Sequence, residues 1–202
     1  PRINVDKSVL SDLDKALKTE WLVTNGLGGY ASSTVLGVNT RKYHGLLIAA
    51  FNPPVDRRVL LTRLNEEIVL GSRTYTFGAN ETEWGIKPEG YEHLSDFSLS
   101  PLPTFTYAVD EQFRLKKTLF MPSGKNATVI SYEASNNDKD TAVVHVAPFV
   151  NSRHFHTVTE RNVPWGFTQR AFDKGVTIQP TTRLSTLILL STEGRYRTEL
   201  EE

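Results

Sequence analysis

The chain has 202 residues, of which 39% are hydrophobic and 23% are charged, and its 23 basic and 23 acidic residues give a formal net charge of zero. This balance provides no long-range attraction to phosphate backbones or anionic lipids, so we expect neither a nucleic-acid nor a membrane partner. The absence of cysteine excludes disulfides, thiolate nucleophiles and Cys-ligated zinc. No apolar run reaches the roughly 20 residues of a membrane span and no signal-peptide pattern opens the chain, so we expect a cytoplasmic protein.

The first predicted element is a short N-terminal helix. Asp6 or Ser8 is the expected capping residue, because both side chains can accept a hydrogen bond from the first free backbone N–H groups. Apolar residues then recur at helical spacing, at Val9, Leu10, Leu13, Ala16 and Leu17.

After Trp21 the pattern changes to short strands separated by turn residues. Gly71 and Ser72 form a two-residue loop suited to a type II′ hairpin. The least regular stretch, residues 80–103, is predicted to be a long loop over one sheet. The expected strands are 45–51, 57–64, 66–70, 73–77, 104–109, 113–121, 127–134, 141–150, 176–182 and 185–192.

These strands predict an all-β fold, a large antiparallel β-sandwich of the supersandwich type, formed by residues 1–202 as a single domain. Strand 113–121 shows the alternation most clearly. Its apolar face carries Phe113, Leu115, Leu119 and Met121, and its polar face carries Arg114, Lys116 and Thr118.

Residues 26–31, Gly-Leu-Gly-Gly-Tyr-Ala, match the dinucleotide-binding pattern G-x-G-x-x-A. That chemistry requires a helix after the glycines, whose N-terminus holds the pyrophosphate. The following residues 32–38 are β-branched and interrupted by Gly37, so they are poor helix formers. The sequence therefore favours a tight glycine turn that needs positive φ or a close backbone approach.

A polar block, residues 39–44, precedes the apolar strand 45–51. On an extended backbone Arg41 and Tyr43 share one face, where they can hydrogen-bond sugar hydroxyls or a neighbouring domain. The alternative is a buried network in which Arg41 pairs with a carboxylate and locks the loop. Spacing alone favours this second interpretation.

His154 and His156 would project to the same side of a strand, as a pair of metal ligands does. No other histidine has the spacing of a third ligand, so we expect hydrogen-bonded structural histidines, with no metal and no cofactor. Trp21, Trp84 and Trp165 are each either a sugar-stacking platform or a packing residue.

Three segments resemble, in order, the N-terminal domain of archaeal and bacterial glycogen debranching enzymes, which are amylo-α-1,6-glucosidases. The first is residues 20–32, Glu-Trp-Leu-Val-Thr-Asn-Gly-Leu-Gly-Gly-Tyr-Ala-Ser, and the second is residues 37–47, Gly-Val-Asn-Thr-Arg-Lys-Tyr-His-Gly-Leu-Leu. The third is residues 148–156, Pro-Phe-Val-Asn-Ser-Arg-His-Phe-His. The resemblance covers nearly the whole chain.

The resemblance implies a β-sandwich within a glycoside hydrolase that cleaves α-1,6 branch points of glycogen or related glucans. It also implies an inverting mechanism whose general acid and base lie in a C-terminal (α/α) barrel. Because the sequence predicts one helix, we expect the barrel to lie outside this chain, and we assign no catalytic residue. The expected partners are that barrel, in the same polypeptide, and the α-glucan substrate.

We expect the polar cluster beside the glycine turn to contact the barrel or glucan hydroxyls, because rigid sandwiches present functional groups on loops. Two other functions remain open: an independent carbohydrate-binding module that tethers α-glucan through aromatic platforms, and a purely structural sandwich. The candidate contact residues are Asn25, Arg41, Tyr43 and His44, with Arg153 and His156 as secondary candidates.

Overall fold

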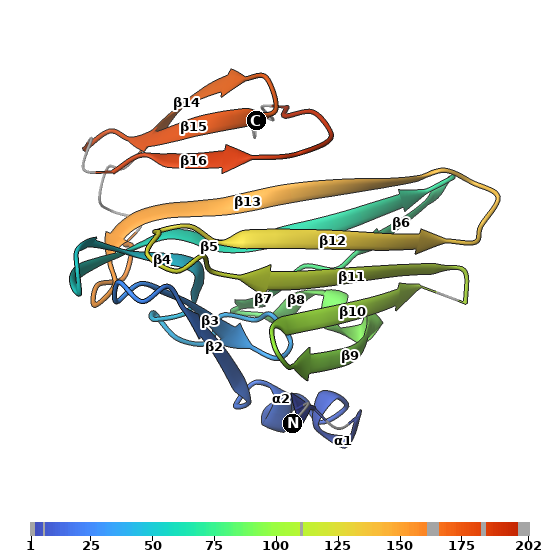
Figure 1. Cartoon of the computed structure of the whole chain (residues 1–202). Coiled ribbons are helices and arrows are strands. Elements are labelled where there is room, and N and C mark those ends of the chain that lie inside the picture. Colours follow the sequence, from blue (N-terminus) through green and yellow to red (C-terminus); the bar gives the residue numbers. More distant parts are fainter. Residues whose placement is uncertain (1–2, 6, 110, 161–165, 183–184, 198–202) are drawn as a thin grey trace. The chain divides into compact units, whose positions relative to one another are not determined.

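The computed structural model describes residues 3–5, 7–109, 111–160, 166–182 and 185–197, and nearly all of its regular structure is antiparallel β-sheet (Figure 1). The chain divides into two compact units, Pro1–Thr157 and Val158–Glu202. The predicted all-β class with helical structure at the N-terminus is confirmed. That residues 1–202 form a single domain stays a prediction. Within the described part of the chain, no helix is long and apolar enough to cross a membrane.

Two sheets carry the core of the first unit. Sheet A has the order β1-β9-β10-β11-β12, and sheet B has the order β13-β5-β4-β3-β2 with β6 beside β5. The strands of sheet A are β1 (Ile3–Asn4), β9 (Leu94–Leu99), β10 (Pro103–Val109), β11 (Phe113–Phe120) and β12 (Val129–Asn136). Those of sheet B are β2 (Glu20–Thr24), β3 (Tyr30–Thr34), β4 (Gly45–Asn52), β5 (Val55–Leu70), β6 (Arg73–Thr76) and β13 (Ala142–His154).

The N-terminal helix is two single turns rather than one element, α1 (Lys7–Leu10) and α2 (Leu13–Ala16). The helix is interrupted at Asp12, whose backbone is extended with φ −101° and ψ 99°. Asp12 then restarts it as an N-cap, accepting a hydrogen bond from the Lys15 N–H. The predicted cap Asp6 lies outside the described residues.

The two predicted strands 57–64 and 66–70 are in fact one 16-residue strand, β5. Asn65 does not interrupt it, because this residue pairs with Ala147 of β13 in the ladder. The hairpin that follows is confirmed, since Leu70 pairs with Arg73 and Gly71 has a φ of 60°.

The prediction of a long loop at residues 80–103 is wrong. This stretch forms β8 (Gly85–Glu89), a 3₁₀ helix η1 (Gly90–His93) and β9, and it begins within β7 (Ala79–Thr82). Strand β9 was not predicted, because its pairing with β10 shifts register. Leu94 pairs with Tyr107, whereas Asp96 pairs with Thr106. The bulge turns both Leu94 and Phe97 into the core, and a simple alternation does not predict this spacing.

The core between the sheets is built by alternating residues. The predicted apolar face of β11 is confirmed, with Phe113, Leu115 and Leu119 fully buried. Aromatic rings join the sheets: Trp21 of β2 meets Phe105 of β10 edge-to-face, with ring centroids 6.1 Å apart.

A charged pair also lies in this core. Lys117 occupies a core-facing position of β11, where its Nζ is 2.6 Å from Oε1 of Glu66 on β5, and only 7% and 1% of these residues are exposed. Tyr132 on β12 donates its hydroxyl to the same carboxylate oxygen at 2.5 Å. Burial, together with the Glu66 charge, raises the pKa of Tyr132, so this hydroxyl keeps its proton and remains a donor.

The second unit is a three-stranded antiparallel sheet with the order β14-β15-β16. Its strands are β14 (Phe167–Phe172), β15 (Gly175–Pro180) and β16 (Leu187–Leu190). Strands near 176–182 and 185–192 were predicted, whereas β14 was not. Four of the six residues of β14 carry polar or small side chains, and five are exposed. The strand therefore lacks the alternating apolar face from which a strand can be predicted.

Removing one member of the buried charged pair should destabilise the fold strongly. We expect Lys117→Met to lower the free energy of unfolding by about 3–5 kcal/mol, because it leaves the Glu66 carboxylate buried without its cation. Adding Glu66→Gln should recover most of this loss, since the amide is neutral and still accepts from Tyr132. Urea denaturation at neutral pH measures both effects.

The matched control is Lys116→Met, which removes an exposed lysine paired with Glu133 on the outer face of the same strand. We expect it to change stability by less than about 1 kcal/mol. Equal losses in the two lysine variants would contradict the assignment of Lys117 as a core residue.

Candidate functional site

The predicted glycine turn is the five-residue loop between β2 and β3, which pair through Thr24 and Tyr30. Gly26 and Gly28 have φ values of 76° and 93°. A Cβ on Gly28 would lie 2.6 Å from the carbonyl oxygen of Pro54, so this position also requires a close backbone approach. A strand follows the glycines instead of a helix, which excludes the dinucleotide-binding interpretation.

Asn25 organises this turn from inside. Its Oδ1 accepts hydrogen bonds from the backbone N–H groups of Leu27 and Gly29, at 2.9 and 3.0 Å. Its Nδ2 donates to the carbonyl of Lys125 and to Oδ1 of Asn126, at 3.0 and 3.1 Å. The residue is 1% exposed, and these four bonds use the full capacity of the amide. The structure therefore places Asn25 in a buried, internal position.

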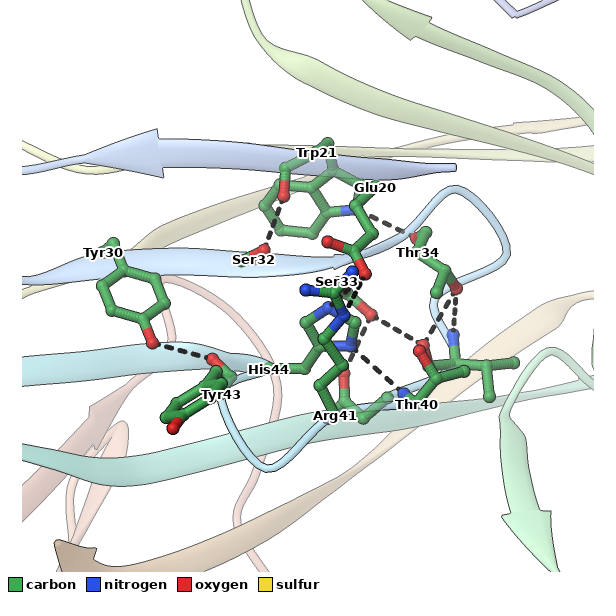
Figure 2. Close-up of polar contacts among 12 residues, drawn as sticks. Glu20, Trp21, Tyr30, Ser32, Ser33, Thr34, Thr40, Arg41, Tyr43 and His44 are labelled. Atoms are coloured by element: carbon green, nitrogen blue, oxygen red, sulfur yellow. Dashed lines mark hydrogen bonds and ion pairs between the residues drawn. The ribbon is translucent and has the colours of Figure 1, made fainter. Parts of the chain in front are cut away.

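The polar block before β4 is a turn, and the expected extended backbone is wrong. The N–H of His44 donates to the carbonyl of Arg41 at 3.0 Å, which brings these two side chains to the same carboxylate (Figure 2). Arg41 Nε lies 2.7 Å from Oε1 of Glu20, and His44 Nε2 lies 3.4 Å from that oxygen. Arg41 pairs with a carboxylate, as the alternative of a buried network predicted, but the predicted burial is wrong, because the Arg41 side chain is 62% exposed.

His44 is buried, and its tautomer is set by its neighbours. Nδ1 accepts a hydrogen bond from the Thr40 N–H at 3.1 Å, so the ring proton of the neutral form lies on Nε2, toward Glu20 (Figure 2). Burial lowers the pKa of His44, the Glu20 carboxylate opposes this shift, and the Arg41 cation adds to it. The net lowering keeps the ring neutral at physiological pH.

The two polar blocks, far apart in sequence, meet in space. The Tyr43 hydroxyl lies 3.2 Å from Nδ1 of His156, and Lys42 Nζ donates to the His156 carbonyl at 2.7 Å. The Tyr43 ring also packs against Phe155, with centroids 5.6 Å apart. From the other side, the Tyr30 hydroxyl donates to the Tyr43 carbonyl at 2.9 Å (Figure 2). Tyr43 is thus fixed by contacts to its backbone, ring and hydroxyl.

Arg153 closes the junction between the blocks. Its guanidinium donates to the carbonyls of Lys42, Phe155 and Thr157, and the first of these residues is 111 positions away. Partial burial lowers the pKa of Arg153. The side chain therefore acts as a multiple donor that holds the turn at 41–44 against the segment after β13.

We name the exposed part of this junction the Tyr43 surface, formed by Arg41, Lys42, Tyr43, Arg153 and His156. The structure brings together five of the six candidate residues, with His44 beneath the surface and Asn25 in the adjacent loop. Sequence reasoning missed Glu20, because nothing in the spacing links it to the turn 21 residues later. The predicted contact role of all six residues stays a prediction.

The Tyr43 surface offers several hydrogen-bond donors: guanidinium and ammonium groups, a phenol and an imidazole. Such a set binds hydroxyl and carbonyl oxygens. In the part of the chain that the structure describes, no three His, Cys, Asp or Glu side chains are grouped as metal ligands.

The family model described as glycogen debranching enzyme N terminal matches residues 19–201. The chain belongs to this family. The resemblance predicted from residues 20–32, 37–47 and 148–156 is therefore confirmed. Comparison with curated proteins and with solved structures gives no match. In this debranching-enzyme N-terminal domain, the matched region contains the glycine turn and every residue of the Tyr43 surface.

Neutral His44 should make the stability of this debranching-enzyme domain depend on pH. Because folding lowers its pKa from the ordinary 6.5, the unfolded chain binds a proton first as the pH falls. The contribution of His44 is present above pH 6.5 and declines below it. We expect the free energy of unfolding, measured in urea at a series of pH values, to fall with a steeper slope in the wild type than in His44→Asn.

Asparagine suits this test because its Oδ1 can accept the Thr40 hydrogen bond and does not titrate. His145→Asn is the control, because the His145 side chain is 55% exposed. Identical slopes for the wild type and His44→Asn would show that His44 is not buried in its neutral form.

Proposed function

We propose that this chain is the non-catalytic N-terminal domain of a glycogen debranching enzyme and that it docks on the active-site side of the catalytic (α/α) barrel. The parent glycoside hydrolase would cleave α-1,6 branch points in glycogen or related glucans. The observation that carries the docking proposal is the Tyr43 surface, where two family segments assemble a group of fixed donors. Arg41, Lys42 and His156 are exposed, and Tyr43 and Arg153 are half-buried. We also propose a cytoplasmic location, which fits a chain without cysteine.

The Tyr43 surface is suited to docking because its side chains are already ordered. Arg41 is held by Glu20 and Arg153 by three carbonyls, while Tyr43 contacts both Phe155 and His156. Binding through such groups loses little side-chain entropy. Backbone carbonyls of a partner domain and hydroxyls of a neutral glucan are both acceptors for these donors.

The same surface lacks the arrangement that glycoside hydrolysis needs. Two carboxyl groups must face each other across the scissile bond. Glu20, the carboxylate that meets this surface, is already paired with Arg41 and lies against His44. This supports a positioning role for the domain and a catalytic role for the barrel.

The test uses the enzyme in which this domain is joined to its barrel. We expect Tyr43→Phe to lower kcat/KM on a branched limit dextrin by about five-fold, since it removes one hydroxyl hydrogen bond. Arg41→Ala should lower it by about ten-fold or more, because a charged donor is lost. Initial rates of glucose release and thermal unfolding are measured for each variant.

The matched controls are Tyr91→Phe and Arg114→Ala, which lie elsewhere in the first unit and should leave kcat/KM unchanged. If Tyr43→Phe and Arg41→Ala also retain full activity and full thermal stability, the docking proposal is wrong. A loss of stability without loss of activity in the folded enzyme would favour a purely structural role.

The second candidate function is an independent module that tethers α-glucan, and Trp84 is the observation that favours it. This tryptophan is 80% exposed in the turn between β7 and β8. Trp21 is 2% exposed and donates its Nε1–H to the Thr34 carbonyl, so it is a packing residue. Trp165 lies outside the described residues.

The module has its own test, calorimetry of the 202-residue chain with maltooligosaccharides. Micromolar binding that Trp84→Ala abolishes would support the module. Under the docking proposal, Trp84→Ala has no effect on any heat of binding, because the contacts lie at the Tyr43 surface.

A further inference from the structure

Four hydroxyl side chains lie side by side across the outer face of sheet A. Ser98 of β9 pairs with Thr104 of β10, Thr104 with Thr118 of β11, and Thr118 with Ser131 of β12. Paired residues of antiparallel strands project to the same face, so these hydroxyls form one row. The row crosses three strand spacings, which is about 14 Å. We call it the hydroxyl row.

The hydroxyl row lies in an open depression of about 330 Å³. Phe120 borders it on one side, where this aromatic ring is 36% exposed. Lys116 and Glu133 border it on the other side and form an ion pair at 3.3 Å. Pro101 and Leu102 complete the lining. The volume is at the lower end of the range for small-ligand sites.

The lining matches the chemistry of a neutral sugar chain. The Thr104 hydroxyl lies 3.2 Å from both the Leu102 carbonyl and the Thr118 hydroxyl, which leaves acceptor capacity on both threonines. Ser98, at one end of the row, is only 5% exposed. The Phe120 ring provides an apolar surface for the C–H face of a pyranose. Lys116 and Glu133 add a donor and an acceptor whose charges cancel, so an anionic ligand gains nothing here.

We propose that the hydroxyl row is an auxiliary site that binds a linear segment of α-glucan with millimolar affinity. It shares no residue with the Tyr43 surface and makes no use of Trp84. The choice of α-glucan rests on the proposed function of the enzyme, whereas the fit to a neutral polyhydroxylated ligand rests on the lining itself. Such a site would hold an outer branch of the polymer on the domain while another branch is cleaved elsewhere.

The experiment is an NMR titration of the 202-residue chain with maltoheptaose, followed through backbone amide shifts. We expect saturable shifts confined to the lining strands, around Ser98, Thr104, Thr118 and Ser131. Thr118→Val removes one hydroxyl at similar shape and should weaken binding about five-fold. Phe120→Ala should weaken it to a similar degree or more, through the loss of the aromatic face.

Thr74→Val is the matched control, because Thr74 is an exposed threonine on β6 of sheet B, outside the depression. It should leave the affinity unchanged. The amide spectrum of each free variant reports its fold, and Thr118→Val and Phe120→Ala test the site independently if one of them fails to fold.

Two results would overturn the proposal: no shifts at millimolar maltoheptaose, or shifts confined to the Tyr43 surface or to Trp84. Equal binding of cellohexaose would overturn the preference for an α-linked chain. These outcomes are separable from a failure of the docking proposal, which is read from the activity of Tyr43 and Arg41 variants in the joined enzyme.

Discussion

Glu66 and Lys117 form an ion pair across the interior of the sandwich, and the alignment of the two sheets depends on it. A buried charge without a partner is severely destabilising, so β11 must face β5 in the register that joins these side chains. A slip by one residue would bury Lys116 or Thr118 and expose the apolar face. The same constraint sends Lys116, Thr118 and Phe120 outward. The buried pair therefore also determines which residues line the hydroxyl row.

Amide side chains also hold the loops of the two sheets together. Asn126, in the loop after β11, pairs with both the N–H and the carbonyl of Ala50 on β4 and accepts from Asn25 in the glycine turn. One loop of sheet A is thereby fixed to two elements of sheet B. The turn that carries Arg41 and Tyr43 lies directly before β4, so its position follows from these bonds. A glycine turn, a polar turn and a distant loop form one rigid region.

The alternation of apolar and polar residues predicted strands that bury one face, as in residues 113–121. It did not predict strands whose pairing is irregular. The β9 bulge at Ser95 changes the spacing of core residues, and no local rule reveals it. Lys117 was left off the predicted apolar face because its type is polar, and only Glu66 on the opposite sheet explains its burial. The Tyr43 surface depends on contacts between residues more than 110 positions apart. Both polar blocks were visible in the sequence, but the contact between them could be seen only in the folded structure.

Most side chains of the family motif at residues 20–47 make contacts that fix the backbone of the domain. Asn25 uses its whole amide on the turn and on the loop at 125–126, Gly28 accommodates Pro54, and Glu20 is occupied by the turn at 41–44. A motif of this kind remains recognisable because each side chain meets a particular backbone group, which few other residue types can do. Its specificity is thus a property of folding, and Arg41, Lys42 and Tyr43 are the residues of this motif that belong to the Tyr43 surface. Residues 20–47 can therefore identify the family through contacts that hold the backbone in place.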